Sequence, residues 1–167
     1  MRNVAAAVAL TLLTLLAAPV LLVCAVFGLP DTFLAYGTWM MDVGRRLLGI
    51  RIEVEDRAAL DRTRPYVLMA NHQSFLDGPL LMTVLHRPAR VIVKRFVFRV
   101  PVLGLGMRFA GYVPLDKEGA GAGRRSIARA ARLMKGKGYS FLIFPEGTRS
   151  WDGRALPLRR GGFFLAL

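Results

Sequence analysis

Apolar side chains are concentrated at the start of the chain. From Val4 to Leu29 there is no charged residue, and only a few polar ones interrupt the run. About 20 such residues can cross the hydrocarbon core of a bilayer. Leu-Pro-Asp at 29–31 breaks the run, and its aspartate can cap a second helix over residues 31–49. The pattern predicts a helical hairpin in residues 1–50 that anchors the chain to a membrane.

Aromatic and basic residues in the second stretch indicate how this hairpin would meet lipid. Tyr36 and Trp39 are of the type that settles at membrane interfaces. Arg45 and Arg46 follow at the polar boundary, which favours the cytoplasmic side. A cleaved signal peptide is the alternative, because Arg2 precedes an apolar run, but that run continues well beyond a cleavage site. We expect a transmembrane or interfacial anchor in the cell (inner) membrane, with the rest of the chain on the cytoplasmic side.

After residue 50 the pattern changes to short apolar runs separated by turn residues. It predicts strands over 65–70, 90–94, 112–115 and 139–144, and helices over 77–85, 126–135 and 160–167. Strands that alternate with helices are typical of an α/β domain. We therefore expect a membrane-associated helical segment in residues 1–50, followed by an α/β domain in residues 51–167 with a mixed sheet flanked by helices.

Two glycine-rich stretches resemble nucleotide-binding loops only weakly. The stretch at 104–111 lacks the G-x-G-x-x-G spacing, and the stretch at 119–123 is not followed by Lys and Ser or Thr. We expect both to be flexible loops.

Charge is as uneven as hydrophobicity. The chain is 54% hydrophobic and has a formal net charge of +13. Residues 1–44 contain one basic and two acidic residues, so the positive excess belongs to the rest of the chain. This balance indicates nucleic acid, an anionic lipid surface or a phosphorylated substrate as a neighbour, and the apolar front favours the lipid. A genome rich in Arg codons would also produce it, because 20 of the 24 basic residues are Arg.

The first candidate for chemistry is the segment NHQSFLD at 71–77, which follows a predicted strand. A carboxylate at Asp77 can fix the tautomer of His72 and leave Nε2 as a proton acceptor. Asp77 could also simply cap its helix. Ser74 lacks a G-x-S-x-G elbow, and the sole cysteine lies in the apolar front, so a substrate hydroxyl is the favoured target of the base. With one cysteine and two histidines we expect no metal site. His86 has no carboxylate nearby in sequence, and we expect it to be a structural or surface histidine.

The second candidate is FPEGTRS at 144–150, which leaves the most strongly predicted strand. Proline and glycine force a tight turn there, from which Glu146 and Arg149 would project. An arginine at the C-terminal end of a strand is well placed to hold a phosphate with two hydrogen bonds.

Together, NHQSFLD and FPEGTRS resemble the first and third signature blocks of the glycerolipid acyltransferases, most closely those that act on 1-acylglycerol 3-phosphate (lysophosphatidate). GYVPLDK at 111–117 is similar to the second block, which usually ends in Arg where this chain has Lys117. Lys keeps the charge but loses the planar fork. The likeness extends from about residue 40 to the end of the chain.

This resemblance implies transfer of a fatty acyl group from a thioester, acyl-CoA or acyl-carrier protein, to the sn-2 hydroxyl of lysophosphatidate. The product would be phosphatidic acid, made in phospholipid biosynthesis. No cofactor, metal, covalent enzyme intermediate or nucleic acid is implied, and the partners would be the two substrates and membrane lipid. An acyltransferase for another lyso-lipid, such as lyso-ornithine lipid, or a non-catalytic basic membrane-binding protein is the alternative.

The site residues follow from the matched positions of the blocks. His72 would be the general base and Asp77 its orienting partner, the pair of the HX4D motif. The residues that would hold the acceptor, with Arg149 and Lys117 on its phosphate, are Glu146, Gly147, Thr148, Arg149 and Lys117.

The family has a fourth block, a proline-containing apolar strand, that this chain lacks. The chain stops within a predicted helix at 160–167 that has no cap or polar tail. We hypothesise that the 167 residues are a fragment of a longer enzyme, truncated at the C-terminus.

Overall fold

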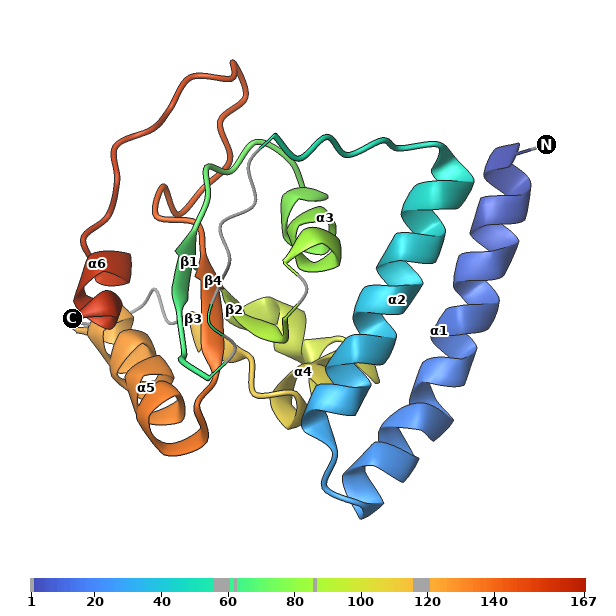
Figure 1. The fold of residues 1–167 in the computed structure, drawn as a ribbon, viewed down its shortest axis with the longest axis horizontal. Coiled ribbons are helices and arrows are strands. Elements are labelled where there is room, and N and C mark those ends of the chain that lie inside the picture. Colours follow the sequence, from blue (N-terminus) through green and yellow to red (C-terminus); the bar gives the residue numbers. More distant parts are fainter. Residues whose placement is uncertain (1, 56–60, 62, 86, 116–120) are drawn as a thin grey trace.

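The structure, a computed structural model, describes residues 2–55, 61, 63–85, 87–115 and 121–167. The chain begins with two helices, α1 (Arg2–Val26) and α2 (Pro30–Leu48), which lie side by side in opposite directions (Figure 1). The Tyr36 hydroxyl donates to the carbonyl of Leu13 at 2.8 Å and joins them. Pro30 starts α2, where its missing N–H costs little, and Gly49 ends it in the left-handed conformation. The predicted helical hairpin is therefore confirmed.

The relation of this hairpin to a membrane is a separate matter. Within the residues that the structure describes, no helix combines the length and the hydrophobicity needed to cross a bilayer. The expected transmembrane helix is thus not found there. Large apolar side chains along α1 are exposed, among them Leu15, Leu22 and Val26.

In the described part of the rest of the chain, a four-stranded sheet is formed by β1 (Val67–Met69), β2 (Ala89–Lys94), β3 (Val113–Leu115) and β4 (Ser140–Ile143). The strand order is β1-β4-β2-β3, and all three pairings of these strands are parallel. The prediction of an α/β fold is confirmed, but the mixed sheet is wrong. Each strand is joined to the next in sequence by a helical crossover, which returns the chain to the same edge of the sheet.

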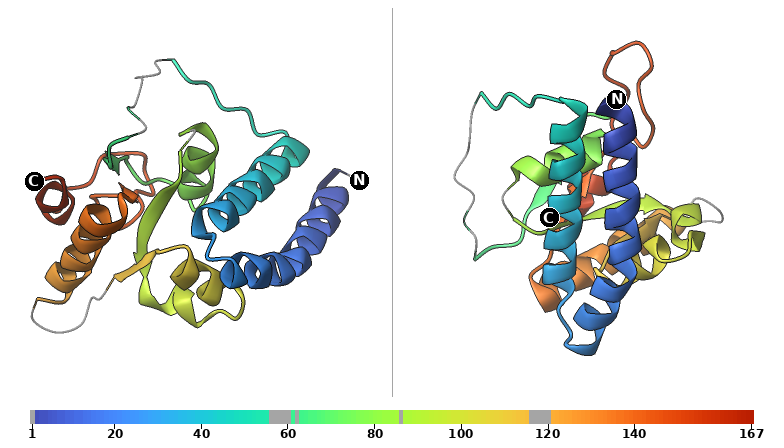
Figure 2. Two further views of the ribbon diagram at one scale, coloured as in Figure 1. Left: turned by 60° about the horizontal axis from the view of Figure 1, so that its bottom comes forward. Right: turned by 90° about the vertical axis from the view of Figure 1, so that its right-hand side faces the viewer.

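Helices cover both faces of the sheet (Figures 1 and 2). α5 (Ala122–Lys137) and α6 (Gly161–Ala166) pack on one face, and α3 (Asp77–Val84) packs on the other. Alternation along β4 serves both layers, because Phe141 and Ile143 join the α5 side while Leu142 joins the α3 side. β4 is paired on both sides, between β1 and β2, and is buried at every residue, so it forms the centre of the core.

One stretch of the chain differs from its prediction. Residues 104–111, expected to be a loop, lie largely in α4 (Leu103–Phe109), which follows the 3-10 helix η1 (Arg95–Arg99). A Cβ at Gly106 would lie 2.7 Å from the ring of Phe33, and the rings of Phe33 and Phe109 meet edge to face at 6.0 Å. Glycine is thus needed here for close packing against α2, and loop flexibility is not its role.

The second glycine stretch lies partly outside the described residues. Residues 119 and 120 are not described, while Gly121 precedes the first turn of α5 in the left-handed conformation. α5 begins at Ala122, earlier than the predicted start at 126.

A buried arginine joins the hairpin to the sheet. Arg90, on β2, is 2% exposed, donates from Nε to the carbonyl of Ala110 at 3.0 Å and pairs with Asp31 in the first turn of α2. Its guanidinium lies 3.3 Å from the centre of the Tyr139 ring. Burial raises the pKa of the neighbouring Tyr112 to about 12, although the Arg90 charge opposes the shift. Asp31 therefore holds α2 against the sheet and does not cap it, since α2 begins one residue earlier, at Pro30.

Candidate functional site

Sheet topology brings the two sequence motifs together. β1 and β4 are adjacent and parallel, so the segments that follow them leave the same edge of the sheet (Figure 1). The N–H of His72 donates to Oε1 of Glu146 at 3.1 Å, across 74 positions of sequence. The N–H of Ser150 donates to the carbonyl of His72 at 2.8 Å. The C-terminal edge of the sheet is therefore one site built from two loops.

His72 and Asp77 form the expected pair. Nδ1 of His72 lies 2.9 Å from Oδ2 of Asp77, and both side chains are 22% exposed. Oδ2 also accepts the N–H groups of Gln73 at 2.7 Å and Ser74 at 2.8 Å. These donors place the carboxylate where it accepts from Nδ1–H, and Nε2 has no hydrogen-bond partner among the described residues. The geometry is that of an oriented base.

The charge of Asp77 is favoured by these contacts. Partial burial works against ionisation, but the N–H of Ser74, the imidazole of His72 and the N–H of Gln73 outweigh it. The pKa of Asp77 consequently lies below its ordinary value. An ionised Asp77 can stabilise the imidazolium that forms when His72 takes a proton.

The ring of His72 is also held by packing. It stacks on Phe144, the first residue after β4, with ring centres 4.1 Å apart and planes 21° from parallel. The aspartate and the phenylalanine together fix the direction in which Nε2 points, which is what an effective base requires.

Glu146 ties the loops together. It is 3% exposed, and while Oε1 accepts from His72, Oε2 accepts the N–H of Leu156 at 3.3 Å. Gly147 has a φ of +70°, and a Cβ there would lie 2.7 Å from Nε of Arg159. Thr148 is exposed. The motif's acid and glycine thus build the loop that presents the residues after them.

Arg149 is half-buried, with its guanidinium 3.5 Å from the centre of the Phe75 ring and 5.0 Å from that of Trp151. Sequence analysis did not single out these two aromatic residues, although one lies inside NHQSFLD and the other directly follows FPEGTRS.

The other predicted residues are placed as follows. Ser74, which was not expected to be a nucleophile, accepts the N–H of Leu76 through Oγ. Lys117 and His86 lie outside the described residues. The roles predicted for the site residues stay predictions.

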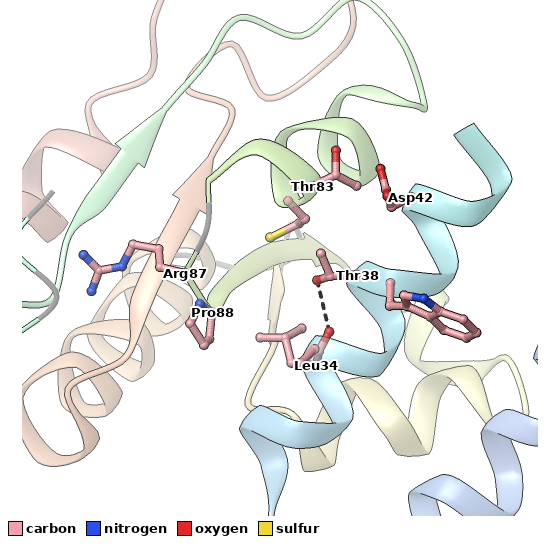
Figure 3. A pocket seen from close by; sticks show the side chains of 9 residues that line it. Leu34, Thr38, Asp42, Thr83, Arg87 and Pro88 are labelled. Atoms are coloured by element: carbon pink, nitrogen blue, oxygen red, sulfur yellow. Dashed lines mark hydrogen bonds between the residues drawn. The ribbon is translucent and has the colours of Figure 1, made fainter. Parts of the chain in front are cut away.

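A cavity of about 380 Å³ lies elsewhere, between α2 and the end of α3 (Figure 3). None of its lining residues belongs to either motif, and its acid, Asp42, is paired with Arg45 and Arg46. Its lining residues are Leu34, Ala35, Thr38, Trp39, Asp42, Met82, Thr83, Arg87 and Pro88. The candidate site therefore remains at the sheet edge.

The chain is similar to known acyltransferases. The family model described as Acyltransferase matches residues 51–167. The chain is 34% identical over 155 residues to 1-acyl-sn-glycerol-3-phosphate acyltransferase alpha of Mus musculus, covering 93% of this chain and 53% of that protein. It is 41% identical over 102 residues to the chloroplastic acyltransferase BAT2 of Brassica napus, covering 61% of this chain and 29% of that protein.

A solved structure has the same fold. It is the crystal structure of the 1-acyl-sn-glycerophosphate (LPA) acyltransferase PlsC from Thermotoga maritima, with a TM-score of 0.70 and 24% identity. The match covers 99% of this chain and 70% of that chain. The chain spans about half the length of the mouse protein and less of the plant one. Because the family model covers most of the chain, including both motifs of the site, this protein belongs to the Acyltransferase family.

Proposed function

We propose that the protein transfers a fatty acyl group from a thioester to the sn-2 hydroxyl of 1-acyl-glycerol 3-phosphate and so makes phosphatidic acid for phospholipid biosynthesis. The observation that carries the proposal is the His72–Asp77 pair, with Nε2 free, on the loop next to the half-buried cation of Arg149. The names of the mouse and plant relatives support the same acceptor.

His72 would act as the general base. Nε2 takes the proton of the acceptor's hydroxyl as its oxygen attacks the thioester carbonyl, and Asp77 stabilises the imidazolium that results. The tetrahedral intermediate then collapses, the C–S bond breaks, and the imidazolium returns the proton to the leaving thiolate. All atoms are accounted for without a covalent enzyme intermediate, and Ser74→Ala should leave the reaction within about threefold of the parent rate.

Arg149 would hold the acceptor's phosphate. Its donors face no acid among the described residues, so a phosphate dianion can accept two of them side by side. Lys117 and the exposed Thr148 are proposed to add contacts to the same headgroup. Glu146 and Gly147 would position the acceptor through the loops that they hold, because both oxygens of Glu146 already accept backbone N–H groups.

The acyl donor is proposed to be acyl-CoA or acyl-carrier protein, and the mechanism uses no cofactor and no metal. We propose that the hairpin holds the protein on the cytoplasmic side of the cell (inner) membrane, through apolar side chains that α1 exposes. Protein that stays with membranes through a high-salt wash supports this location, whereas release by salt alone contradicts it.

The function is tested with membranes that contain the full-length protein, a labelled acyl thioester and a panel of lyso-lipids. We expect labelled phosphatidic acid from lysophosphatidate, and a fall of about 10²–10⁴-fold in His72→Ala with membrane association unchanged. His86→Ala is the matched control, since it removes the other histidine of the chain.

Three results of this assay would count against the proposal. Faster labelling of lyso-ornithine lipid or another lyso-lipid would assign a different acceptor. An unchanged rate of acyl transfer in His72→Ala would show that His72 is not the general base. No transfer at all, with salt-sensitive binding to anionic vesicles, would favour a non-catalytic membrane-binding protein.

A further inference from the structure

Two aromatic side chains at the site are exposed to solvent. Phe75 is 76% exposed and Trp151 is 87% exposed. Neither belongs to the two hydrophobic clusters of the core, so packing in the interior does not explain them. What they share is Arg149, whose guanidinium lies 3.5 Å and 5.0 Å from their ring centres. Both distances are within the roughly 6 Å range of a cation–π interaction.

Stacking and hydrogen bonding use different parts of a guanidinium. The rings of Phe75 and Trp151 contact the cation with their faces, whereas the N–H donors of a guanidinium lie in its own plane. Among the described residues, Arg149 makes no hydrogen bond and no ion pair. The two rings therefore restrict its long side chain without occupying a donor, and less side-chain entropy is left to be lost when an anion binds.

The same short turns hold both the base and the stack. Phe75 directly follows Ser74, whose N–H binds the carboxylate of Asp77 at 2.8 Å. Trp151 follows Ser150, whose N–H binds the carbonyl of His72 at 2.8 Å. On each loop, the ring that contacts the cation is therefore one residue away from a backbone group that is bonded to His72 or Asp77.

We propose that Phe75 and Trp151 are positioning residues that hold the guanidinium of Arg149 in place for the phosphate of the acceptor. The proposal rests on the proposed function and adds to it two side chains that act through Arg149. It places the determinant of phosphate recognition in a three-residue stack made from both loops.

The main test compares Phe75→Leu with Phe75→Tyr in the full-length protein in membranes. Leucine keeps an apolar side chain without a ring face, and tyrosine restores the ring. We expect Phe75→Leu to raise KM for lysophosphatidate roughly threefold to tenfold with kcat little changed, and Phe75→Tyr to keep the parent KM. Trp151→Leu should act in the same direction more weakly, because its ring is farther from the cation.

Two controls separate this role from a general one. Phe96→Leu removes another exposed aromatic, 61% exposed on η1, and should leave KM unchanged. In an Arg149→Ala background, Phe75→Leu should have no further effect on KM, because its only action is through the arginine. An equal rise in KM in that background, an equal effect with a lyso-lipid acceptor that lacks phosphate, or a loss of kcat alone would overturn the proposal.

A second readout does not depend on acyl transfer. The chain has two tryptophans, so a Trp39→Phe variant reports on Trp151 alone. We expect Arg149→Ala in this background to increase quenching of Trp151 by acrylamide, and glycerol 3-phosphate to change its emission only when Arg149 is present. Identical Trp151 fluorescence with and without Arg149 would overturn the proposal that Trp151 packs against this arginine. Absence of transfer to lysophosphatidate with this signal intact would instead count against the proposed function.

Discussion

Arg90 and Arg149 both lie over an aromatic ring, at 3.3 Å and 3.5 Å from the ring centres, yet their surroundings differ completely. Arg90 is 2% exposed, donates to the carbonyl of Ala110 and pairs with Asp31. Arg149 is half-buried and, among the described residues, has no hydrogen bond or ion pair. One arginine joins two parts of the fold, and the N–H donors of the other have no partner among the described residues.

The difference shows how to separate a structural cation from a binding one in this fold. Burial of a charge is tolerated where protein groups satisfy it, as at Arg90. A cation that is oriented by packing but not neutralised, beside an oriented base, indicates a site for an anion. This distinction is tested by substituting each arginine and measuring whether stability or catalysis changes.

Of the two arginines, Arg149 is expected to have the larger effect on catalysis when it is changed to Ala. Loss of a charge-assisted bidentate contact should raise KM for lysophosphatidate by about 10- to 100-fold. The free energy of unfolding should fall by only about 1 kcal/mol, because among the described residues the side chain has no hydrogen bond to lose and gives up only its contacts with two exposed rings. Steady-state kinetics and thermal unfolding in detergent measure the two. A KM rise of the same size for an acceptor without phosphate would contradict the assigned role.

The next effect is expected from Arg90→Met, on stability. This change leaves the carbonyl of Ala110 without its donor and removes the stack on Tyr139, so the free energy of unfolding should fall by about 2–3 kcal/mol. Asp31 is 59% exposed on its side chain and stays hydrated when its partner is lost. KM measured on the folded protein should not change. An Arg90→Met protein as stable as the parent would mean that the contacts of Arg90 between α2 and the sheet do not contribute to stability.

A smaller effect on stability is expected from substituting a glycine next to Tyr139 and Arg90. Gly111 has a φ of +85°, and a Cβ there would lie 2.7 Å from the Tyr139 ring, which Arg90 covers. Gly153 has a φ of +76° with no atom within 4 Å of such a Cβ, and so serves as a matched control. Gly111→Ala should cost about 2 kcal/mol and Gly153→Ala about 1 kcal/mol. Equal decreases in Tm for Gly111→Ala and Gly153→Ala would show that the Tyr139 ring can move aside at little cost.

The smallest effect is expected from acid. The folded pKa of Asp77 lies below its ordinary value of 3.8, so its contribution to stability is complete above that value and is lost as pH falls through the folded pKa. Below about pH 4 the parent should therefore lose stability more steeply than Asp77→Asn. Unfolding midpoints across an acid series would measure the slopes. Parallel curves for the parent and Asp77→Asn would show that the Asp77 carboxylate does not contribute to the loss of stability in acid.

Sequence patterns anticipated the elements better than their arrangement. All four strands and the hairpin follow from local hydrophobicity, and the residues of the base follow from a motif. The parallel order β1-β4-β2-β3 could not be deduced, because it depends on which surfaces pack after the helices form. The glycines of α4 were misinterpreted for the same reason, since only the approach of the Phe98 backbone to Gly104 and of the Phe33 ring to Gly106 shows why they are small.

At the site, prediction stopped at the motif residues. Nothing in the sequence shows that Glu146 is buried between two backbone N–H groups, or that Phe75 lies under Arg149. Both facts depend on contacts between loops that are distant in sequence. Aromatic residues inside or next to the two motifs were the available signal, and they carry meaning only once the loops are known to meet.

The position of β4 also constrains the order in which the protein can be assembled. Among the described strands β4 is synthesised last, yet it lies between β1 and β2, and β1 has no other strand neighbour in the described chain. His72 therefore leaves the ribosome long before the loop that binds its backbone N–H exists. A nascent chain holds His72 without Arg149, and the two halves of the candidate site become neighbours only when β4 inserts.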